Sequence, residues 1–427
     1  MPNAAGLTGT AYLCANTIGV YNTGGKFTLY QPIILNRKFT AEYIFTGQEL
    51  LSFPSAIITS ASGTIIDLVP LEDAGEGIEV MKGLLCPGFV NAHCHLELSH
   101  LKGIIPENTG LVEFVQLVMS KRAADAELKV GAMQQALNEL YQSGTVLVGD
   151  ICNTTDTLAI KKESLLRWHN FIEVSGFTDT AAASRMKAVN AVRDQFLLQN
   201  NHWPVTVCPH APYSVSNALF QLLNHQSANQ VITIHNQECA AENELYQAGT
   251  GKFRELYRNF AINDSAFQPT GTSSFQSWLP FFNQQQTMIA VHNTFINGKD
   301  LSFAAQQGIQ PNLWHCLCVN ANRYIEQAFP PLELLLLHTD NIVVGTDSYA
   351  SNHQLNILEE LKTIQRYAGN SVSLPMMLKW ATYNGALALQ QAATLGSFSK
   401  GKMPGIVLVE HLDGVKLSPL SVATRIL

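Results

Sequence analysis

The sequence predicts an α/β protein, a (β/α)8 TIM barrel with a small β-sandwich domain formed by both chain ends. Apolar runs alternate with longer amphipathic stretches from about residue 85 to residue 395, which is typical of βαβ units and a parallel sheet. Eight of the apolar runs read as strands, the count of a closed (β/α) barrel. With 427 residues, 46% of them hydrophobic, the chain is long enough for a barrel plus a smaller unit.

The predicted barrel strands are short and bounded by turn-forming residues. They span residues 85–92, 145–150, 168–174, 204–208, 231–234, 288–291, 309–313 and 342–344. The helices predicted between them include 111–121, 130–142, 181–198, 217–224 and 355–367. Between the fifth and sixth strands, we expect residues 251–286 to form a long loop and helix that cover the active site.

The two chain ends have a different texture from the barrel region. Residues 36–88 and 396–427 contain short alternating segments punctuated by Gly, Pro and Asp, which predict antiparallel strands. Neither piece is long enough for a core of its own, so we expect them to pair as one composite β-sandwich. The predicted organisation is an N-terminal extension (1–35), this composite domain (36–88 with 396–427) and a catalytic barrel (89–395).

Composition and charge exclude several classes of partner. The 26 basic and 33 acidic residues give a net charge of -7 without a basic block, which argues against nucleic acid. No apolar run reaches the roughly 18 residues needed to span a bilayer, and no signal peptide is evident, so we expect no membrane partner. The eight cysteines follow no disulfide framework, which favours a cytoplasmic protein with reduced thiols. We expect a small-molecule substrate, with a homodimer as one candidate assembly.

Histidines and carboxylates stand at the ends of the predicted strands. His93 and His95 lie two residues apart at the end of the first strand, so both imidazoles project from one face and can chelate one ion. A pair of ordinary strand histidines is the alternative interpretation. His235, His292 and Asp347 end the fifth, sixth and eighth strands. Barrel enzymes place their chemistry at these strand ends, which favours a common site.

Three histidines and a carboxylate form a ligand set suited to one divalent metal ion. Zinc is the first choice and ferrous iron the alternative, with one position left open for water. Such an ion can lower the pKa of water from 15.7 to roughly 7 and so make hydroxide near neutral pH. The reaction still needs a proton acceptor and a donor to the leaving group. Glu238 and His292 are the groups available for this work.

The order H-x-H, H-x-x-E, H and T-D-S on successive strands resembles the amidohydrolase superfamily. Within it, the sequence is similar to the aminohydrolase branch that deaminates cytosine, guanine and adenosine-like compounds, including S-adenosylhomocysteine, methylthioadenosine and aminodeoxyfutalosine. The resemblance covers nearly all of residues 36–427. It implies that the metal is bound by His93, His95, His235 and Asp347. It further implies that Glu238 shuttles protons to the substrate nitrogen, and that His292 orients the hydroxide and polarises the reacting centre.

A single metal is favoured over a binuclear centre. Binuclear relatives need a carboxylated lysine near the end of the fourth strand, and no lysine occurs between Lys187 and Lys252. The resemblance implies that His210 faces the substrate. Glu173 has three open roles: substrate pocket, structural and metal ligand. The predicted substrate-binding set consists of His210, Glu97, His100, Glu173, Asn153 and Trp314.

These observations predict a metal-dependent hydrolytic deaminase that acts on an amino-substituted aromatic ring, of adenosine type, through metal-bound hydroxide. Asp347 is both ligand and catalytic residue in this prediction. Hydrolysis of a cyclic amide or of a ring chloride by the same machinery is the alternative, because attack at an electrophilic carbon is common to all three. A degenerate barrel that serves as a binding module would need a broken metal set, and none of the predicted ligands is missing.

Overall fold

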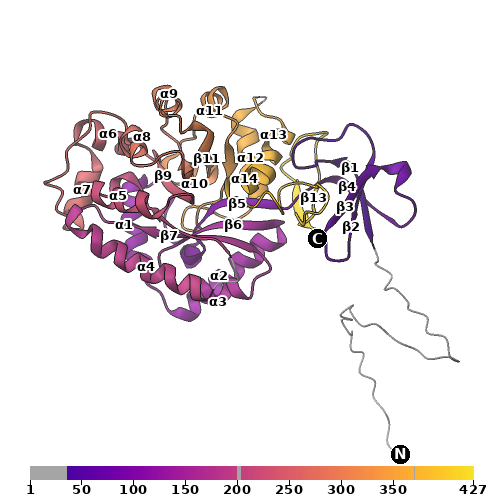
Figure 1. The fold of residues 1–427 in the computed structure, drawn as a ribbon, viewed down its shortest axis with the longest axis horizontal. Coiled ribbons are helices and arrows are strands. Elements are labelled where there is room, and N and C mark those ends of the chain that lie inside the picture. The colour runs from indigo at the N-terminus through magenta and orange to yellow at the C-terminus, as the bar shows by residue number, and fades with distance from the viewer. Residues whose placement is uncertain (1–35, 200–202, 370) are drawn as a thin grey trace, which may run out of the picture.

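The computed structural model describes residues 36–199, 203–369 and 371–427, so the predicted extension 1–35 lies outside the described residues. Figure 1 shows a large α/β body beside a smaller β-rich unit. Among the described residues, no helix has the length and apolarity required to cross a bilayer.

The α/β body contains two four-stranded parallel sheets within the described part of the chain, with orders β5-β6-β7-β8 and β12-β11-β10-β9. Contacts link the sheets at both edges: the backbone N–H of His235 donates to the carbonyl of His210 over 2.9 Å, and Cys94 forms a parallel bridge with Asp347. The strands are β5 (Phe89–Cys94), β6 (Thr145–Cys152), β7 (Arg167–Val174), β8 (Val205–Pro209), β9 (Val231–Asn236), β10 (Thr287–His292), β11 (Leu313–Leu317) and β12 (Ile342–Val344).

Helices follow the strands along the chain and pack their apolar faces against them. Local signals start several of them: Ser216 accepts the backbone N–H of Leu219 before α5, and Asn297 and Asp300 form a capping box at α9. The helices are α1 (Leu111–Lys121), α2 (Ala126–Gln142), α3 (Leu158–Lys162), α4 (Ala182–Gln199), α5 (Asn217–Gln226), α6 (Ala240–Ala248), α7 (Lys252–Asn259), α8 (Ser274–Trp278), α9 (Gly298–Gln306), α10 (Val319–Glu326), α11 (Leu332–His338), α12 (Ile357–Ala368), α13 (Leu374–Lys379) and α14 (Gly385–Ala388).

Two predicted barrel strands were placed wrongly. The seventh, expected at 309–313, is β11 (Leu313–Leu317), because residues Gln310–Asn312 form a 3-10 turn with Pro311 in its first positions. The first, expected at 85–92, combines the end of one strand with the start of another. Strand β4 ends at Cys86 and β5 begins at Phe89, so Pro87 and Gly88 separate the two strands. Only glycine fits at position 88, because a Cβ there would lie 2.2 Å from Val146 Cγ1.

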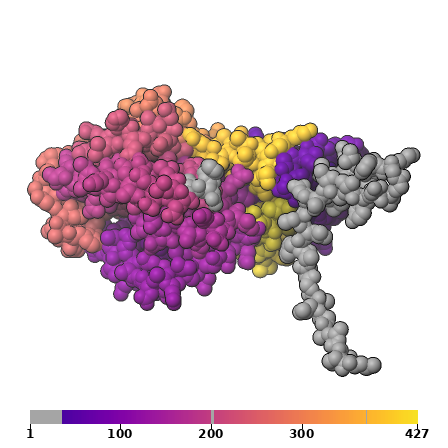
Figure 2. Space-filling model, turned by 60° about the horizontal axis from the view of Figure 1, so that its bottom comes forward, coloured from indigo at the N-terminus to yellow at the C-terminus, as the bar shows by residue number. Residues whose placement is uncertain are grey.

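The two chain ends meet in one six-stranded sheet of order β14-β13-β4-β1-β2-β3. Its C-terminal strand β13 pairs antiparallel with β4 from the N-terminal part of the chain, and Figure 2 shows the yellow C-terminal residues between the indigo sheet and the body. A second sheet that would complete a sandwich stays a prediction. The strands are β1 (Arg37–Ile44), β2 (Ser55–Thr59), β3 (Ile65–Pro70), β4 (Ile78–Cys86), β13 (Val407–Glu410) and β14 (Val422–Arg425).

Candidate metal centre and substrate cavity

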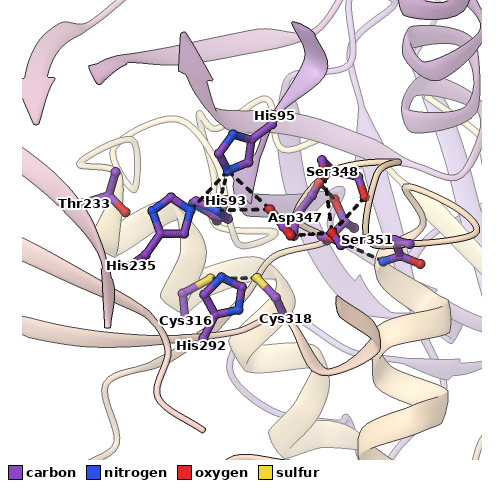
Figure 3. Close-up of polar contacts among 12 residues, drawn as sticks. His93, His95, Thr233, His235, His292, Cys316, Cys318, Asp347, Ser348 and Ser351 are labelled. Carbon is purple, nitrogen blue, oxygen red and sulfur yellow. Dashed lines mark hydrogen bonds and ion pairs between the residues drawn. The ribbon is translucent and has the colours of Figure 1, made fainter. Parts of the chain in front are cut away.

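Imidazole nitrogens and a carboxylate converge where β5, β9 and β12 end (Figure 3). The Nε2 atom of His95 lies 3.1 Å from Nε2 of His93 and 3.2 Å from Nε2 of His235. Asp347 Oδ1 lies 3.3 Å from His95 Nε2 and 3.5 Å from His93 Nε2. A single Nε2–H cannot satisfy two facing nitrogens, whereas one shared cation can. All four side chains are buried, as a metal centre that excludes bulk water requires.

Backbone and side-chain contacts hold these groups in place. The backbone N–H groups of Thr346 and Asp347 both donate to the carbonyl of His93, over 3.0 and 3.1 Å, which fixes Asp347 beside the H-x-H strand. Ser351 donates its hydroxyl to Asp347 Oδ2 (Figure 3). His235 Nδ1 contacts the carbonyl of His210 at 2.8 Å, so Nδ1 carries the hydrogen and Nε2 presents its lone pair to the cluster.

Burial controls the protonation of the cluster. It lowers the pKa of His95 and of His292 to about 4, and it lowers the pKa of His235 well below its usual range, with the neighbouring histidines adding to the shift. Burial alone would raise the pKa of Asp347, but the hydrogen bond from His93 and the nearby His95 and His292 hold that pKa well below its ordinary value. Neutral imidazoles and an ionised carboxylate are the forms that bind a divalent metal.

Glu238 and His292 lie next to the cluster. Glu238 Oε2 is 3.5 Å from His292 Nε2, and His292 Nδ1 donates to Asn322 Oδ1 over 2.7 Å. Atoms of His292, His93, His235 and Asp347 all lie within 4.8 Å of one another. Burial raises the pKa of Glu238 well above its usual range, and the negative charge of Asp347 raises it further. A carboxyl with such a pKa can hold a proton near neutral pH.

A cavity of about 580 Å³ borders this cluster. Its lining includes the polar residues Asn153, Thr154 and Glu173, apolar residues of α1 and α4, and two arginines, Arg122 and Arg185. No described residue from 251–286 lines the cavity, so the prediction that this segment covers the site is wrong. Helix α7 of this segment instead contacts a residue that lines the cavity, because Tyr257 donates its hydroxyl to the carbonyl of Tyr213 over 2.6 Å.

Three predicted substrate-binding residues line the cavity, namely His210, Glu173 and Asn153. His210 Nδ1 contacts the hydroxyl of Ser214 at 2.7 Å, which orients the ring. Asn153 donates from Nδ2 to Glu173 Oε2 over 2.9 Å. Contact of these three residues with substrate stays a prediction.

The other three, Glu97, His100 and Trp314, are not among the residues that line the cavity, and their contact with substrate stays a prediction. Glu97 is buried and accepts the backbone N–H groups of Asn153 and Thr154, each over 3.1 Å. His100 Nε2 contacts the carbonyl of Arg122 at 3.1 Å. Trp314 lies on β11 with its ring in the hydrophobic core, because the strand begins later than predicted.

Several residues that hold the site residues in place were not predicted from the sequence. Glu242 accepts the backbone N–H groups of Gln237 and Glu238 over 3.0 and 2.8 Å, and so shapes the turn that presents Glu238. Asn322 orients His292, and Ser351 orients Asp347. The only signal for Glu242 and Ser351 is a spacing of four residues from a site residue, and Asn322 has none.

The cysteines take no part in this cluster. The seven cysteines in the described part of the chain are free and buried. Cys94, between the two histidines of H-x-H, packs with Leu96 and Met133, and burial raises the pKa of its thiol. Strand alternation thus turns Cys94 away from the face that carries His93 and His95, as predicted.

A family model described as "Amidohydrolase family" matches residues 84–424. The chain belongs to the amidohydrolase family. This amidohydrolase is 28% identical over 284 residues to an aminodeoxyfutalosine deaminase from Nitratiruptor sp., a match that covers 65% of the present chain and 67% of that relative.

Two solved structures resemble this amidohydrolase in fold. An aminofutalosine deaminase from Helicobacter pylori, crystallised with methylthio-coformycin, superposes with a TM-score of 0.74 at 22% identity and covers 90% of this chain and 93% of that one. An adenosine deaminase from Xanthomonas campestris with bound zinc has a TM-score of 0.68 at 22% identity, covering 90% and 86%. At this identity, the likeness establishes the fold alone.

Proposed function

We propose that this amidohydrolase is a metal-dependent hydrolytic deaminase that acts on an adenosine-type nucleoside. The observation that carries the proposal is the cluster of three imidazoles and a carboxylate beside the buried Glu238, at the edge of a cavity large enough for a nucleoside. The names of the curated relative and of both structural neighbours, all deaminases, support the same reaction. The net reaction replaces a ring amino group by oxygen, consumes water and releases ammonia.

His93, His95, His235 and Asp347 would hold the metal ion in this proposal. Their donor set of nitrogens and one oxygen fits a borderline divalent ion, for which zinc is the first choice and ferrous iron the alternative. When bound, such an ion supplies a Lewis acid that makes water nucleophilic near neutral pH. The zinc named in the Xanthomonas campestris structure supports the choice.

Glu238 would carry protons to the leaving nitrogen. Its raised pKa lets the buried carboxyl hold a proton at neutral pH and donate that proton as the carbon–nitrogen bond breaks. His292, fixed by Asn322, faces Glu238 and would orient the attacking oxygen. His210 lines the cavity with its ring centre 4.9 Å from that of His235, and would contact the base of the substrate.

We also propose the domain organisation expected from the sequence: an extension at 1–35, a composite β-sandwich from 36–88 and 396–427, and a (β/α)8 barrel over 89–395. The contacts between β8 and β9 and between β5 and Asp347 support closure of the two parallel sheets into a barrel. The unpaired cysteines support a cytoplasmic location. A homodimer stays a prediction, which a solution mass measurement tests.

Ammonia release tests the proposed reaction directly. Zinc-loaded protein is assayed across aminopurine, nucleoside and pyrimidine panels, and adenosine-type nucleosides are expected to release ammonia. An opened ring would indicate a cyclic amide hydrolase, and chloride from a chlorinated ring would indicate a chlorohydrolase. Either product without ammonia would replace the proposal by the corresponding alternative.

Removal of single ligands tests the metal assignment. We expect His93→Ala, His235→Ala and Asp347→Ala each to abolish bound metal and activity together, because each change removes one donor atom of the proposed ligand set and leaves a gap where that atom held the ion. His225→Ala is the control, since His225 lies exposed on α5 and should leave both unchanged. Elemental analysis measures the metal content. Stoichiometric metal in all three ligand variants would contradict the assignment.

A further inference from the structure

Glu173 lines the cavity and has one carboxylate oxygen without a hydrogen-bond partner. Its side chain is only 6% exposed, and Oε2 accepts the hydrogen bond from Asn153. Its other oxygen, Oε1, is buried and has no hydrogen-bond partner among the described residues. A buried acceptor without a partner is costly, so an oxygen that faces a binding cavity in this state is suited to a group that a ligand brings.

A second metal ion is one conceivable partner, because Glu173, His210 and His235 have donor atoms within 4.8 Å of one another. The hydrogen bonds of this group argue against it. His235 Nδ1 is engaged by the carbonyl of His210, His235 Nε2 faces His95, and His210 Nδ1 is engaged by Ser214. Only Glu173 Oε1 and one nitrogen of His210 remain, fewer than the three or four protein ligands of a zinc site. A hydrogen-bond donor is the better match for Oε1.

The chemistry of the proposed substrate identifies that donor, and this step rests on the proposed function. In an adenine nucleoside, N1, N3 and N7 are acceptors and N9 carries the sugar. The exocyclic amino group is the only donor on the base, and it leaves from the reacting carbon at the metal centre. Glu173 Oε1 lies 3.6 Å from Nδ1 of His235, whereas the other ring nitrogen, Nε2, faces the cluster, so the His235 ring stands between Oε1 and the other proposed ligands. The remaining donors of the substrate are the hydroxyl groups of the ribose.

We propose that Glu173 Oε1 accepts a hydrogen bond from a ribose hydroxyl and thereby selects nucleosides over free bases. Asn153 holds Oε2 of Glu173, which lines the cavity, so the carboxylate is fixed in one orientation with Oε1 left without a partner before substrate binds. Glu173 is therefore a specificity-determining residue and contributes neither a proton nor a metal ligand.

Combining variants of Glu173 with substrates that lack single hydroxyl groups tests whether Glu173 binds a ribose hydroxyl. Wild-type protein and the Glu173→Gln and Glu173→Met variants are assayed with adenosine, 2′-deoxyadenosine, 3′-deoxyadenosine, 5′-deoxyadenosine and adenine. For the wild type, loss of one particular hydroxyl should lower kcat/KM about 10- to 100-fold, as expected for a hydrogen bond to a charged group. Both variants should lose a similar factor on adenosine but little on the analogue that lacks this hydroxyl, because the two changes remove the same contact.

Two further measurements separate the outcomes. Elemental analysis should give the same metal content for the wild type and for both Glu173 variants. The control is Glu163→Gln, the same change at an exposed residue, which should alter neither the kinetics nor the metal content. An equal loss on every substrate, or efficient turnover of adenine by the wild type, would overturn the assignment of Glu173. A second equivalent of metal that disappears with Glu173 would identify a cation site instead. Wild-type protein that releases no ammonia from any nucleoside would overturn the proposed function itself.

Discussion

Burial acts in opposite directions on the acid and the bases of this site, and both directions prepare it for metal-assisted hydrolysis. Burial disfavours a positive charge on His95 and His292, which leaves their nitrogens free as neutral ligands or acceptors. The same burial disfavours a negative charge on Glu238, so that carboxyl can carry a proton at a pH where an exposed glutamate cannot. Asp347 keeps its charge because three histidines surround it.

Replacement of Glu238 should separate proton transfer from metal binding. We expect Glu238→Gln to keep its full complement of metal while turnover falls by roughly 10² to 10⁴, the usual contribution of a positioned acid or base. The amide has the size of the carboxyl but cannot carry the proton. Steady-state kinetics and elemental analysis measure the two effects, with Glu163→Gln as the matched control. A rate within twofold of the wild type would remove Glu238 from the mechanism.

At the scale of elements, the ends of parallel strands were predictable but the contacts that fix them were not. H-x-H and H-x-x-E could be read because both motifs lie within a few residues of a strand end. The partners of Asp150 could not, because Lys161 and the backbone N–H of Leu96 come from separate segments. Strand β11 was misplaced because an apolar residue, Ile309, precedes the turn that delays the strand.

The buried pair of Asp150 and Lys161 ties α3 to the loop after β5. Lys161 Nζ lies 2.5 Å from Asp150 Oδ2, and Asp150 Oδ1 accepts the backbone N–H of Leu96, the residue after His95, over 2.8 Å. Both side chains are almost fully buried, and the nearby Asp150 raises the pKa of Lys161 despite its burial. The pair therefore connects the packing of a helix to the position of a proposed metal ligand.

Replacing one partner of this pair should lower the free energy of unfolding far more than replacing both partners. We expect Lys161→Met to lower the free energy of unfolding by about 3 to 5 kcal/mol, because Asp150 is left as an unpaired buried charge. The double variant Asp150→Asn with Lys161→Met should recover most of that loss. Lys129→Met is the control, since its ion pair with Asp156 is partly exposed and contributes at most about 1 kcal/mol. Denaturant unfolding measures all four proteins, and equal losses for Lys161→Met and Lys129→Met would contradict the argument.

At the scale of the whole molecule, both chain ends close on the side of the α/β body away from the metal centre. Gly144 precedes β6 with a positive φ of 91°, and a Cβ there would lie 2.4 Å from Val407 of β13. Arg425 of β14 donates from Nε to the carbonyl of Tyr141 over 3.0 Å, donates from Nη2 to the carbonyl of Thr145, and lies 4.2 Å from the centre of the Tyr141 ring. Thr145 begins β6, whereas the proposed metal ligands lie at the opposite strand ends.

This arrangement predicts that stability and catalysis can be separated at Arg425. Arg425→Met keeps an apolar stem over Tyr141 but removes the hydrogen bonds that Arg425 donates to the carbonyls of Tyr141 and Thr145, which should lower the free energy of unfolding by about 1 to 3 kcal/mol. Because the junction lies at the far ends of the strands, kcat and KM should match those of the wild type below the unfolding transition. Arg193→Met, which removes a surface pair with the adjacent Asp194, should change neither property. Thermal unfolding and steady-state kinetics on the same preparations decide the question. A large fall in kcat with unchanged stability would mean that the composite sheet acts on the reaction itself.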